Sequence, residues 1–405
     1  MPSSQRFTPF SELIDLNPRG RVGPTADLVP YVGMGDVSNN GQLMRIGERP
    51  AAQLAPGQTC FQDEDVLFAK ITPCMENGKG AYVQGLDGRI AFGSTEFHVL
   101  RARPGVSSRF VYHWTRSRKF RRSAEVMMTG SAGQRRVPAA FFERYRIQHR
   151  TLSEQHHIAE TLDAVNERIV LAQALLAKLA TTRDGVLDHL LRYGVHTGRR
   201  EKETLVGAIP EGWNVRGIGE ICSVGSGGTP PRKEGAKFFT HGGVPWVKTL
   251  DLTEGEVSAT SETLTPLAVK SARLRTYPPG SVLVAMYGGW EQIGRTGILS
   301  LPATVNQAIS ALEPGSDVDP VYLLCALQHG RPRWRRVAAS SRKDPNITKD
   351  DVRKFLIPLP PLEEQAKIVE IRDALLSQLS WAAADLRKSC QLQESLLDDL
   401  LMGTL

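Results

Sequence analysis

The chain has 405 residues, of which 41% are hydrophobic and 23% charged, and its formal net charge is +7. At about 150 residues per domain, this length predicts two or three globular units, and the composition is that of a soluble globular protein. No apolar run approaches the roughly 18 residues that a membrane span needs, the N-terminus lacks the features of a secretory signal, and five scattered cysteines form no CxxC pair. We therefore expect a cytoplasmic protein without a membrane partner, a disulfide framework or a metal site.

In chain order, the pattern predicts two globular domains that alternate with two long helices. The expected segments are a domain at 1–150, a helix at 151–193, a linker at 194–210, a second domain at 211–358 and a C-terminal helix at 359–405. Both domains have β-branched runs between turn residues, which predicts strands, and helices are expected near 110–122 and 321–328. The predicted class is α+β.

Positive charge is concentrated in one run of each domain. Residues 101–150 contain thirteen Lys or Arg and two acids, and residues 331–354 contain nine and three. Basic runs with interspersed aromatic residues favour a phosphate-backbone partner, and a solvated helix surface is the alternative.

The chain is internally duplicated. Residues 145–192 align without gaps onto residues 355–402, and sixteen of 48 positions are identical. Upstream, VPYVGMGDV from Val29 resembles VPWVKTLDL from Val244, and DVLFAKI from Asp65 resembles SVLVAMY from Ser281. A repeat of this kind predicts two copies of one domain-and-helix arrangement.

Both long helices carry apolar residues at heptad spacing. A helix of about 40 residues would be about 60 Å long, which is too long to pack inside one small domain. We therefore expect the two helices to pair as an antiparallel coiled coil that separates the domains in a pseudo-two-fold repeat; the alternative is that each helix packs on its own domain. The expected pairing residues are Leu162, Ile169, Leu176, Leu190, Leu376, Leu379, Leu386, Leu397 and Leu400.

Recognisable catalytic motifs are absent from the sequence. It has no GxxxxGK[ST] phosphate loop, and NPRG and DPNI fall short of the motif with which an amino methyltransferase holds a flipped base. The glycine-rich GSGGTPP at 225–231 ends in two prolines that disfavour a helix start, so it is interpreted as a recognition loop. We predict no catalytic and no metal-binding residue.

The whole chain resembles the specificity subunits of type I restriction-modification systems. The motifs that carry the resemblance are KITPCMENGKG from Lys70 and FGSTEFHVL from Phe92 in the first half, and IPEGW, GSGGTPP, VPWVKTLDL, VNQAISAL and PNITKDDVRKFLIPLPPLEEQ in the second. The resemblance implies a non-catalytic subunit with two target-recognition domains, each of which reads one part of a split double-stranded DNA target. The first half offers NPRGRVGPTADL where the second has GSGGTPP, so the two domains should read different sequences.

The resemblance also implies partners and cofactors. These are two modification subunits that carry S-adenosylmethionine, and restriction subunits that use ATP and magnesium. None of these cofactors should bind this chain directly, and the paired helices should act as a spacer and a docking surface.

Polar and basic side chains in the marked segments are the candidate DNA contacts, because Arg and Lys suit guanine or phosphate, and Asn and Gln suit adenine. In the first domain they are Lys70, Thr72, Asn77, Lys79, Ser94, Thr95, Glu96, Arg135 and Arg136. In the second they are Thr229, Arg232, Lys233, Lys248, Tyr287, Arg295, Asn306, Gln307, Arg342, Lys343 and Asn346. Turn formation by Asn77 or Thr229 and helix capping by Glu96 are structural alternatives.

Two functions from other classes stay open at this point. One is a degenerate DNA methyltransferase, which would bind S-adenosylmethionine as the isolated chain. The other is a coiled-coil scaffold with protein partners only, which would show no salt-dependent DNA binding.

Overall fold

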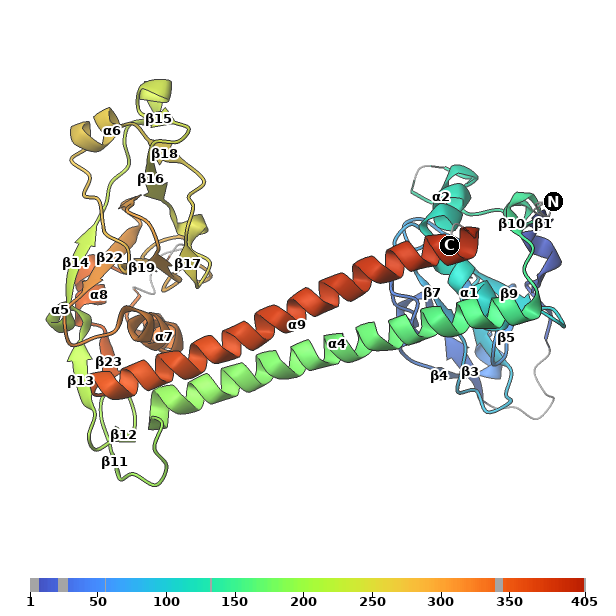
Figure 1. Cartoon of the computed structure of the whole chain (residues 1–405), viewed down its shortest axis with the longest axis horizontal. Coiled ribbons are helices and arrows are strands. Elements are labelled where there is room, and N and C mark those ends of the chain that lie inside the picture. Colours follow the sequence, from blue (N-terminus) through green and yellow to red (C-terminus); the bar gives the residue numbers. More distant parts are fainter. Residues whose placement is uncertain (1–6, 21–27, 55, 132, 339–344, 404–405) are drawn as a thin grey trace. The chain divides into compact units, whose positions relative to one another are not determined.

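The computed structural model describes residues 7–20, 28–54, 56–131, 133–338 and 345–403, and Figure 1 labels its elements. The chain divides into two compact units, one made of Met1–Leu175 with Ala382–Leu405 and the other of Leu176–Trp381. Each unit holds one globular domain and a stretch of both long helices. With 41% helix and 23% strand, the chain has the predicted α+β class. Each unit includes part of both long helices, so the units do not test the expected boundaries of domains, linker and helices. These boundaries stay predictions.

Two four-stranded sheets form the first domain. One has the order β2-β9-β6-β7, with β2 at Ile14–Leu16, β9 at Phe97–Ala102, β6 at Val66–Ala69 and β7 at Gly80–Tyr82. The other has the order β4-β3-β8-β5, with β4 at Gly47–Pro50, β3 at Leu28–Val32, β8 at Ala91–Gly93 and β5 at Thr59–Phe61. Strand β6 is buried on both faces: Val66 and Phe68 belong to one core cluster, and Leu67 and Ala69 to another. This explains its uninterrupted apolar sequence.

Short helices and one strand pair complete the first domain. They are α1 at Ser108–Arg116, α2 at Arg118–Val126, α3 at Ala140–Arg144, and the pair of β1 at Phe7–Pro9 with β10 at Arg146–Gln148. The helix expected near 110–122 is thus two helices. The break falls at Ser117, whose hydroxyl accepts a hydrogen bond from Phe120 N and so caps a new helix start.

The second domain has a five-stranded sheet, a second four-stranded sheet and two strand pairs. The five-stranded sheet has the order β14-β22-β19-β20-β17, with β14 at Cys222–Ser226, β22 at Ile309–Pro314, β19 at Val282–Ala285, β20 at Thr296–Leu299 and β17 at Glu256–Val257. The four-stranded sheet has the order β15-β18-β16-β21, with β15 at Phe239–Thr240, β18 at Thr263–Leu264, β16 at Val244–Val247 and β21 at Thr304–Val305. The pairs are β11 at Glu201–Lys202 with β12 at Ile209–Pro210, and β13 at Asn214–Gly217 with β23 at Leu356–Leu359.

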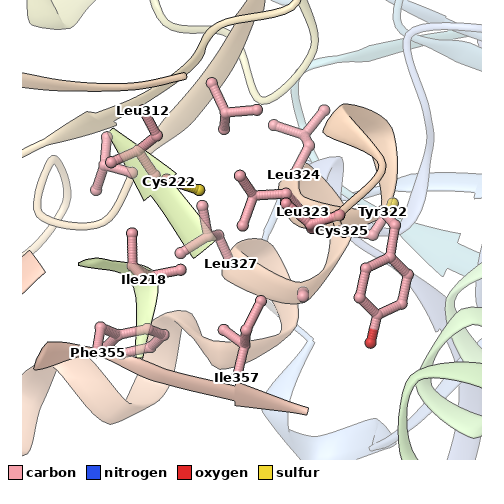
Figure 2. Packing of buried hydrophobic residues seen from close by; sticks show 14 of the residues in the cluster. Ile218, Cys222, Leu312, Tyr322, Leu323, Leu324, Cys325, Leu327, Phe355 and Ile357 are labelled. Atoms are coloured by element: carbon pink, nitrogen blue, oxygen red, sulfur yellow. The ribbon is translucent and has the colours of Figure 1, made fainter. Parts of the chain in front are cut away.

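The helices of the second domain are α5 at Ile218–Ile221, α6 at Pro266–Ser271, α7 at Pro320–Gly330 and α8 at Lys349–Lys354. Helix α7 confirms the helix expected near 321–328. Figure 2 shows its Leu323, Leu324 and Leu327 side chains packed among Ile218 and Leu312, within the main core cluster of this unit. Buried apolar side chains from α7, β22 and β23 therefore hold the domain together.

The duplication extends to topology. The pair β1–β10 corresponds to β13–β23, and the sheet β2-β9-β6-β7 corresponds to β14-β22-β19-β20. Helix α1 follows β9 as α7 follows β22, and α3 precedes β10 as α8 precedes β23. The predicted internal repeat is therefore present in the backbone of both domains.

The long helices are α4 at Leu152–Tyr193 and α9 at Leu362–Met402. Within the first unit they run antiparallel, because Arg168 on α4 pairs with Asp385 on α9 at 2.9 Å while Asn166 pairs with Gln393. This confirms the predicted antiparallel pairing. None of the helices in the described ranges is both long and apolar enough to pass through a membrane.

The ends of the long helices also pack on the domains. Leu162, Leu397 and Leu401 belong to the main core cluster of the first unit, and Leu190 belongs to that of the second. Of the nine expected pairing residues, Leu162, Ile169, Leu190 and Leu397 are buried and the other five are half-buried. The two alternatives considered for the helices, mutual pairing and packing on a domain, thus both occur in different stretches.

A buried glutamine recurs at equivalent positions of the two long helices, as Gln155 and Gln365. Gln155 accepts a hydrogen bond from Ser107 N and donates one to Arg150 O, at 3.0 and 2.9 Å. Gln365 repeats this by accepting from Asp319 N at 2.8 Å and donating to Pro360 O at 2.8 Å and Asp317 O at 3.0 Å. Ser107 and Asp319 are the N-caps of α1 and α7. Each glutamine therefore joins the start of a long helix to the start of a domain helix.

Replacing Gln365 with Ala should leave the buried Asp319 N–H and two carbonyls without partners, at a cost of about 1–3 kcal/mol in unfolding free energy. Urea denaturation of the full chain measures this loss. Lys367→Ala is the matched control on the same helix, since it removes only an exposed ion pair with Glu363. Equal destabilisation by both substitutions would contradict the role assigned to Gln365.

Candidate nucleic-acid interface

The chain makes the same backbone hydrogen bonds at the end of strand β6 in the first domain and at the end of the equivalent strand β19 in the second. Just after β6, Lys70 N donates to Glu96 O at 2.9 Å, and Lys70 O accepts from Val137 N at 2.9 Å. Just after β19, Met286 N donates to Ala308 O at 2.7 Å, and Met286 O accepts from Ile347 N at 3.0 Å. We call these two regions the reading edges. They contain many of the candidate DNA contacts.

The reading edges carry different side chains at equivalent positions. The equivalent pairs, first domain named first, are Lys70 and Met286, Ser94 and Asn306, Thr95 and Gln307, Glu96 and Ala308, and Arg136 and Asn346. The first edge therefore has three ionisable side chains where the second has none. The second instead presents three amides, from Asn306, Gln307 and Asn346.

An ion network occupies the first reading edge. Arg136 donates two hydrogen bonds to the Glu96 carboxylate, at 2.8 and 2.9 Å. These bonds hold the pKa of Glu96 below its usual value, while burial lowers the pKa of nearby Lys70. Beside them, Arg135 pairs with Glu76 at 2.9 Å, and the Thr72 hydroxyl donates to Arg135 O at 3.3 Å. The fold brings these cations together beside carboxylates that orient them.

The remaining candidates of the first domain differ in their availability. Asn77 and Thr95 are exposed, whereas the Ser94 hydroxyl accepts a hydrogen bond from Glu96 N at 3.2 Å. The Lys79 ammonium donates to Met34 O at 2.8 Å, so it is engaged with the 3-10 helix Met34–Asp36. The basic run 101–150 is partly internal in the same way, since Arg121 is buried and donates to Met75 O at 2.7 Å.

A carboxylate also organises cations in the second domain. Glu262 pairs with both Lys248 and Arg232, each at 2.5 Å, and these contacts lower its pKa. The Arg232 guanidinium lies 4.6 Å from the centroid of the Phe239 ring. The Arg232 guanidinium also lies 5.3 Å from the centroid of the Trp246 ring, and Trp246 Nε1 donates to Gly228 O at 3.1 Å. The group therefore borders the GSGGTPP loop.

Most other candidates of the second domain lie at or beside its reading edge, whereas Lys233 lies on the 3-10 helix Arg232–Lys237. The Thr229 hydroxyl pairs with the Gln307 side chain, and the Asn306 side chain accepts from Ala308 N at 3.1 Å. Tyr287 and Lys233 are exposed, Asn346 is half-buried, and Arg295 donates to the Gln292 side chain at 3.2 Å. Arg342 and Lys343 lie outside the described residues.

Trp290 is a surface residue that the candidate set omitted. It exposes 44% of its area on the loop that joins β19 to β20. The sequence signal was the segment YGGW, in which two glycines precede a large aromatic residue.

Residues 210–382 match the family model described as "Type I restriction modification DNA specificity domain". The chain carries a type I DNA specificity domain. Over the second domain, the match agrees with the family that the sequence motifs indicated. The domain covers most of the second unit, including its reading edge.

Curated relatives agree with this assignment. The specificity subunit of the type I restriction enzyme EcoAI from Escherichia coli is 29% identical over 271 residues, which are 66% of this chain and 40% of that protein. The EcoEI specificity subunit from Escherichia coli is 35% identical over 168 residues, 40% of this chain and 27% of that protein. The matched parts thus span less than half the length of these relatives.

The fold is shared with the crystal structure of the HsdS subunit from Thermoanaerobacter tengcongensis. The TM-score is 0.56 at 22% identity, and the match covers 100% of this chain and 98% of that chain. Among the residues described for this chain, His, Cys, Asp and Glu side chains form no group of three or more that could hold a metal ion.

Replacing Glu262 with Gln should release Lys248 and Arg232 at the surface of the specificity domain. Each released cation that reaches a DNA phosphate should steepen the slope of log K against log[salt] by about 0.9. Titration of a DNA duplex by fluorescence anisotropy at several salt concentrations measures the slope. Glu234→Gln is the matched control, because Glu234 has the same 28% exposure but pairs only with Lys237 three residues away. An identical slope for both variants would show that these cations do not reach DNA.

Proposed function

We propose that this chain is the DNA-specificity subunit of a type I restriction-modification complex, and that each domain reads one part of a split target. The observation that carries the proposal is the pair of reading edges, which share one backbone and differ in their side chains. Two copies of one framework with different polar groups are what two readers of different base sequences require.

The chemistry of the two edges supports different roles. Arg136 and Lys70 are suited to guanine or to phosphate, and Glu96 is suited to the amino group of cytosine. The amides of Asn306, Gln307 and Asn346 are suited to adenine. In each domain, cations outside the edge would contact the DNA backbone and so fix the register without reading sequence.

The proposed complex supplies the chemistry that this chain does not. The relatives EcoAI and EcoEI are named as specificity subunits of type I restriction enzymes. By analogy, two modification subunits with S-adenosylmethionine and restriction subunits with ATP and magnesium would join this chain. It would have no catalytic role of its own and would act on genomic DNA in the cytoplasm. The match to specificity subunits does not favour the scaffold or methyltransferase alternatives.

The decisive experiment is to express the chain with its modification subunit in cells and to map methylated bases across the genome. The proposal predicts methylation within one split motif, and the motif disappears when the chain is omitted. Methylation without a split motif, or methylation that persists without the chain, would refute the proposal.

Substitutions on the purified complex should separate base reading from backbone contact. Gln307→Ala should weaken binding to the mapped target by about 1–3 kcal/mol and relax one base position. Arg135→Ala should weaken binding to target and random duplex alike, and reduce the salt slope by about 0.9. Competition binding with single-base variants of the target distinguishes the two patterns. The assignment is wrong if Gln307→Ala lowers affinity equally for all duplexes.

A further inference from the structure

Trp290 is exposed in a protein that buries most of its tryptophans. Four of the six, Trp114, Trp213, Trp246 and Trp334, expose less than 2% of their area. Trp290 exposes 44% and Trp381, on α9, exposes 76%. A large aromatic surface left in water is costly unless a ligand covers it.

The loop that carries Trp290 is held rigidly at its base. Gly288 and Gly289 have φ values of 110° and 79°, which bend the chain in a conformation that side chains disfavour. Ile293, three residues after Trp290, is buried in the core, and its N–H donates to Gly289 O at 3.0 Å. Arg331 donates to Glu291 O at 2.6 Å and to Ile293 O at 3.2 Å. Trp290 therefore projects from a fixed support.

The surroundings of Trp290 are basic. The 3-10 helix η6, Arg331–Arg336, contains four arginines, and the Arg335 guanidinium lies 6.0 Å from the centroid of the Trp290 ring. Arg335 and Arg336 are exposed. An aromatic side chain among exposed cations is suited to nucleic acid, because the cations attract the phosphates and the ring can stack on a base. The core of a protein interface is instead depleted of charged residues.

The Trp290 loop is continuous with the second reading edge. It begins at Met286, whose N–H donates to Ala308 O beside Asn306 and Gln307. The equivalent loop of the first domain has the same length, because Ala69 N donates to Lys79 O as Ala285 N donates to Arg295 O.

The first-domain loop, however, offers no aromatic surface. Its Asn77 is exposed and its Met75 is buried. The exposed aromatic side chains, Tyr287 and Trp290, thus belong to only one of these two equivalent loops.

We propose that Trp290 inserts between two neighbouring base pairs at the half-site of the second domain and partly unstacks them. This inference rests on the proposed DNA-specificity function and adds a second kind of recognition to it. Unstacking costs less at flexible base steps, so a wedge selects DNA by its deformability, without a hydrogen bond to a base edge. The first domain, with a polar loop tip, would read its half-site without such a wedge.

The test uses the full chain with its modification subunit and the mapped target duplex, labelled at both ends for energy transfer. Trp290→Ala should reduce the DNA bend and weaken binding by about 5- to 100-fold, whereas Trp290→Phe should retain most of both. Leu205→Ala, which removes another exposed apolar side chain of the same unit, is the matched control and should change neither. Equal melting temperatures of the variants establish that folding is intact, since Trp290 lies outside the core.

A mismatch at the contacted base step provides an independent measurement. It lowers the cost of unstacking, so it should tighten binding by the unmodified chain and have little effect on Trp290→Ala. Unchanged bend and affinity in Trp290→Ala would overturn the wedge. Loss of the modification subunit from that variant would also overturn it, because the tryptophan would then contact protein. Both results leave intact the split methylation motif on which the proposed function depends.

Discussion

A buried amide hydrogen bond connects the two kinds of structure in this chain. Gln155 and Gln365 each bond to the backbone of the N-cap residue of a domain helix, from a position in the first turn of a long helix. A buried N–H without a partner costs more than most single contacts gain, so the bond restricts where helix and domain can lie. Because both copies keep this bond, each domain has a defined position relative to the start of the long helix that follows it.

In the reading edges, different groups serve folding and recognition: the backbone forms the fold, and the side chains are available for recognition. Their frame consists of main-chain hydrogen bonds and buried apolar strands, which depend little on the exposed side chains. A lysine, a glutamate and an arginine can therefore stand where the other copy has methionine, alanine and asparagine. Electrostatic attraction should contribute more in the first domain, and hydrogen bonding by amides more in the second.

The sequence predicted the features that depend on pattern: the α+β class, the repeat and the antiparallel helices. It could not predict how one residue type is used in each copy. Asp163 and Asp373 are identical in the alignment, yet Asp163 accepts from Arg109 and from His113 at 2.8 Å each. Partial burial alone would raise the pKa of Asp163, but these bonds outweigh it and hold the pKa at about 2. Asp373 is exposed and pairs with the adjacent Arg372.

At the candidate DNA-binding site, the sequence could not predict the conformation of the loops. Lys79 was predicted to contact DNA because of its residue type. The turn at Gly78 instead directs its ammonium to a backbone carbonyl. The sequence did not predict an exposed Trp290, because the conformation of its loop depends on the positive φ angles of Gly288 and Gly289. Periodicity carries no information on either turn.

Leu397 and Leu401 close the core of the unit that contains the first domain. The whole second unit, residues 176–381, therefore leaves the ribosome before that core can be completed. The core of the first domain therefore stays incomplete while the second domain is synthesised. The core of the second unit, in contrast, consists of residues from one continuous stretch of the chain. A truncation near the C-terminus should thus damage the domain at the opposite end of the sequence.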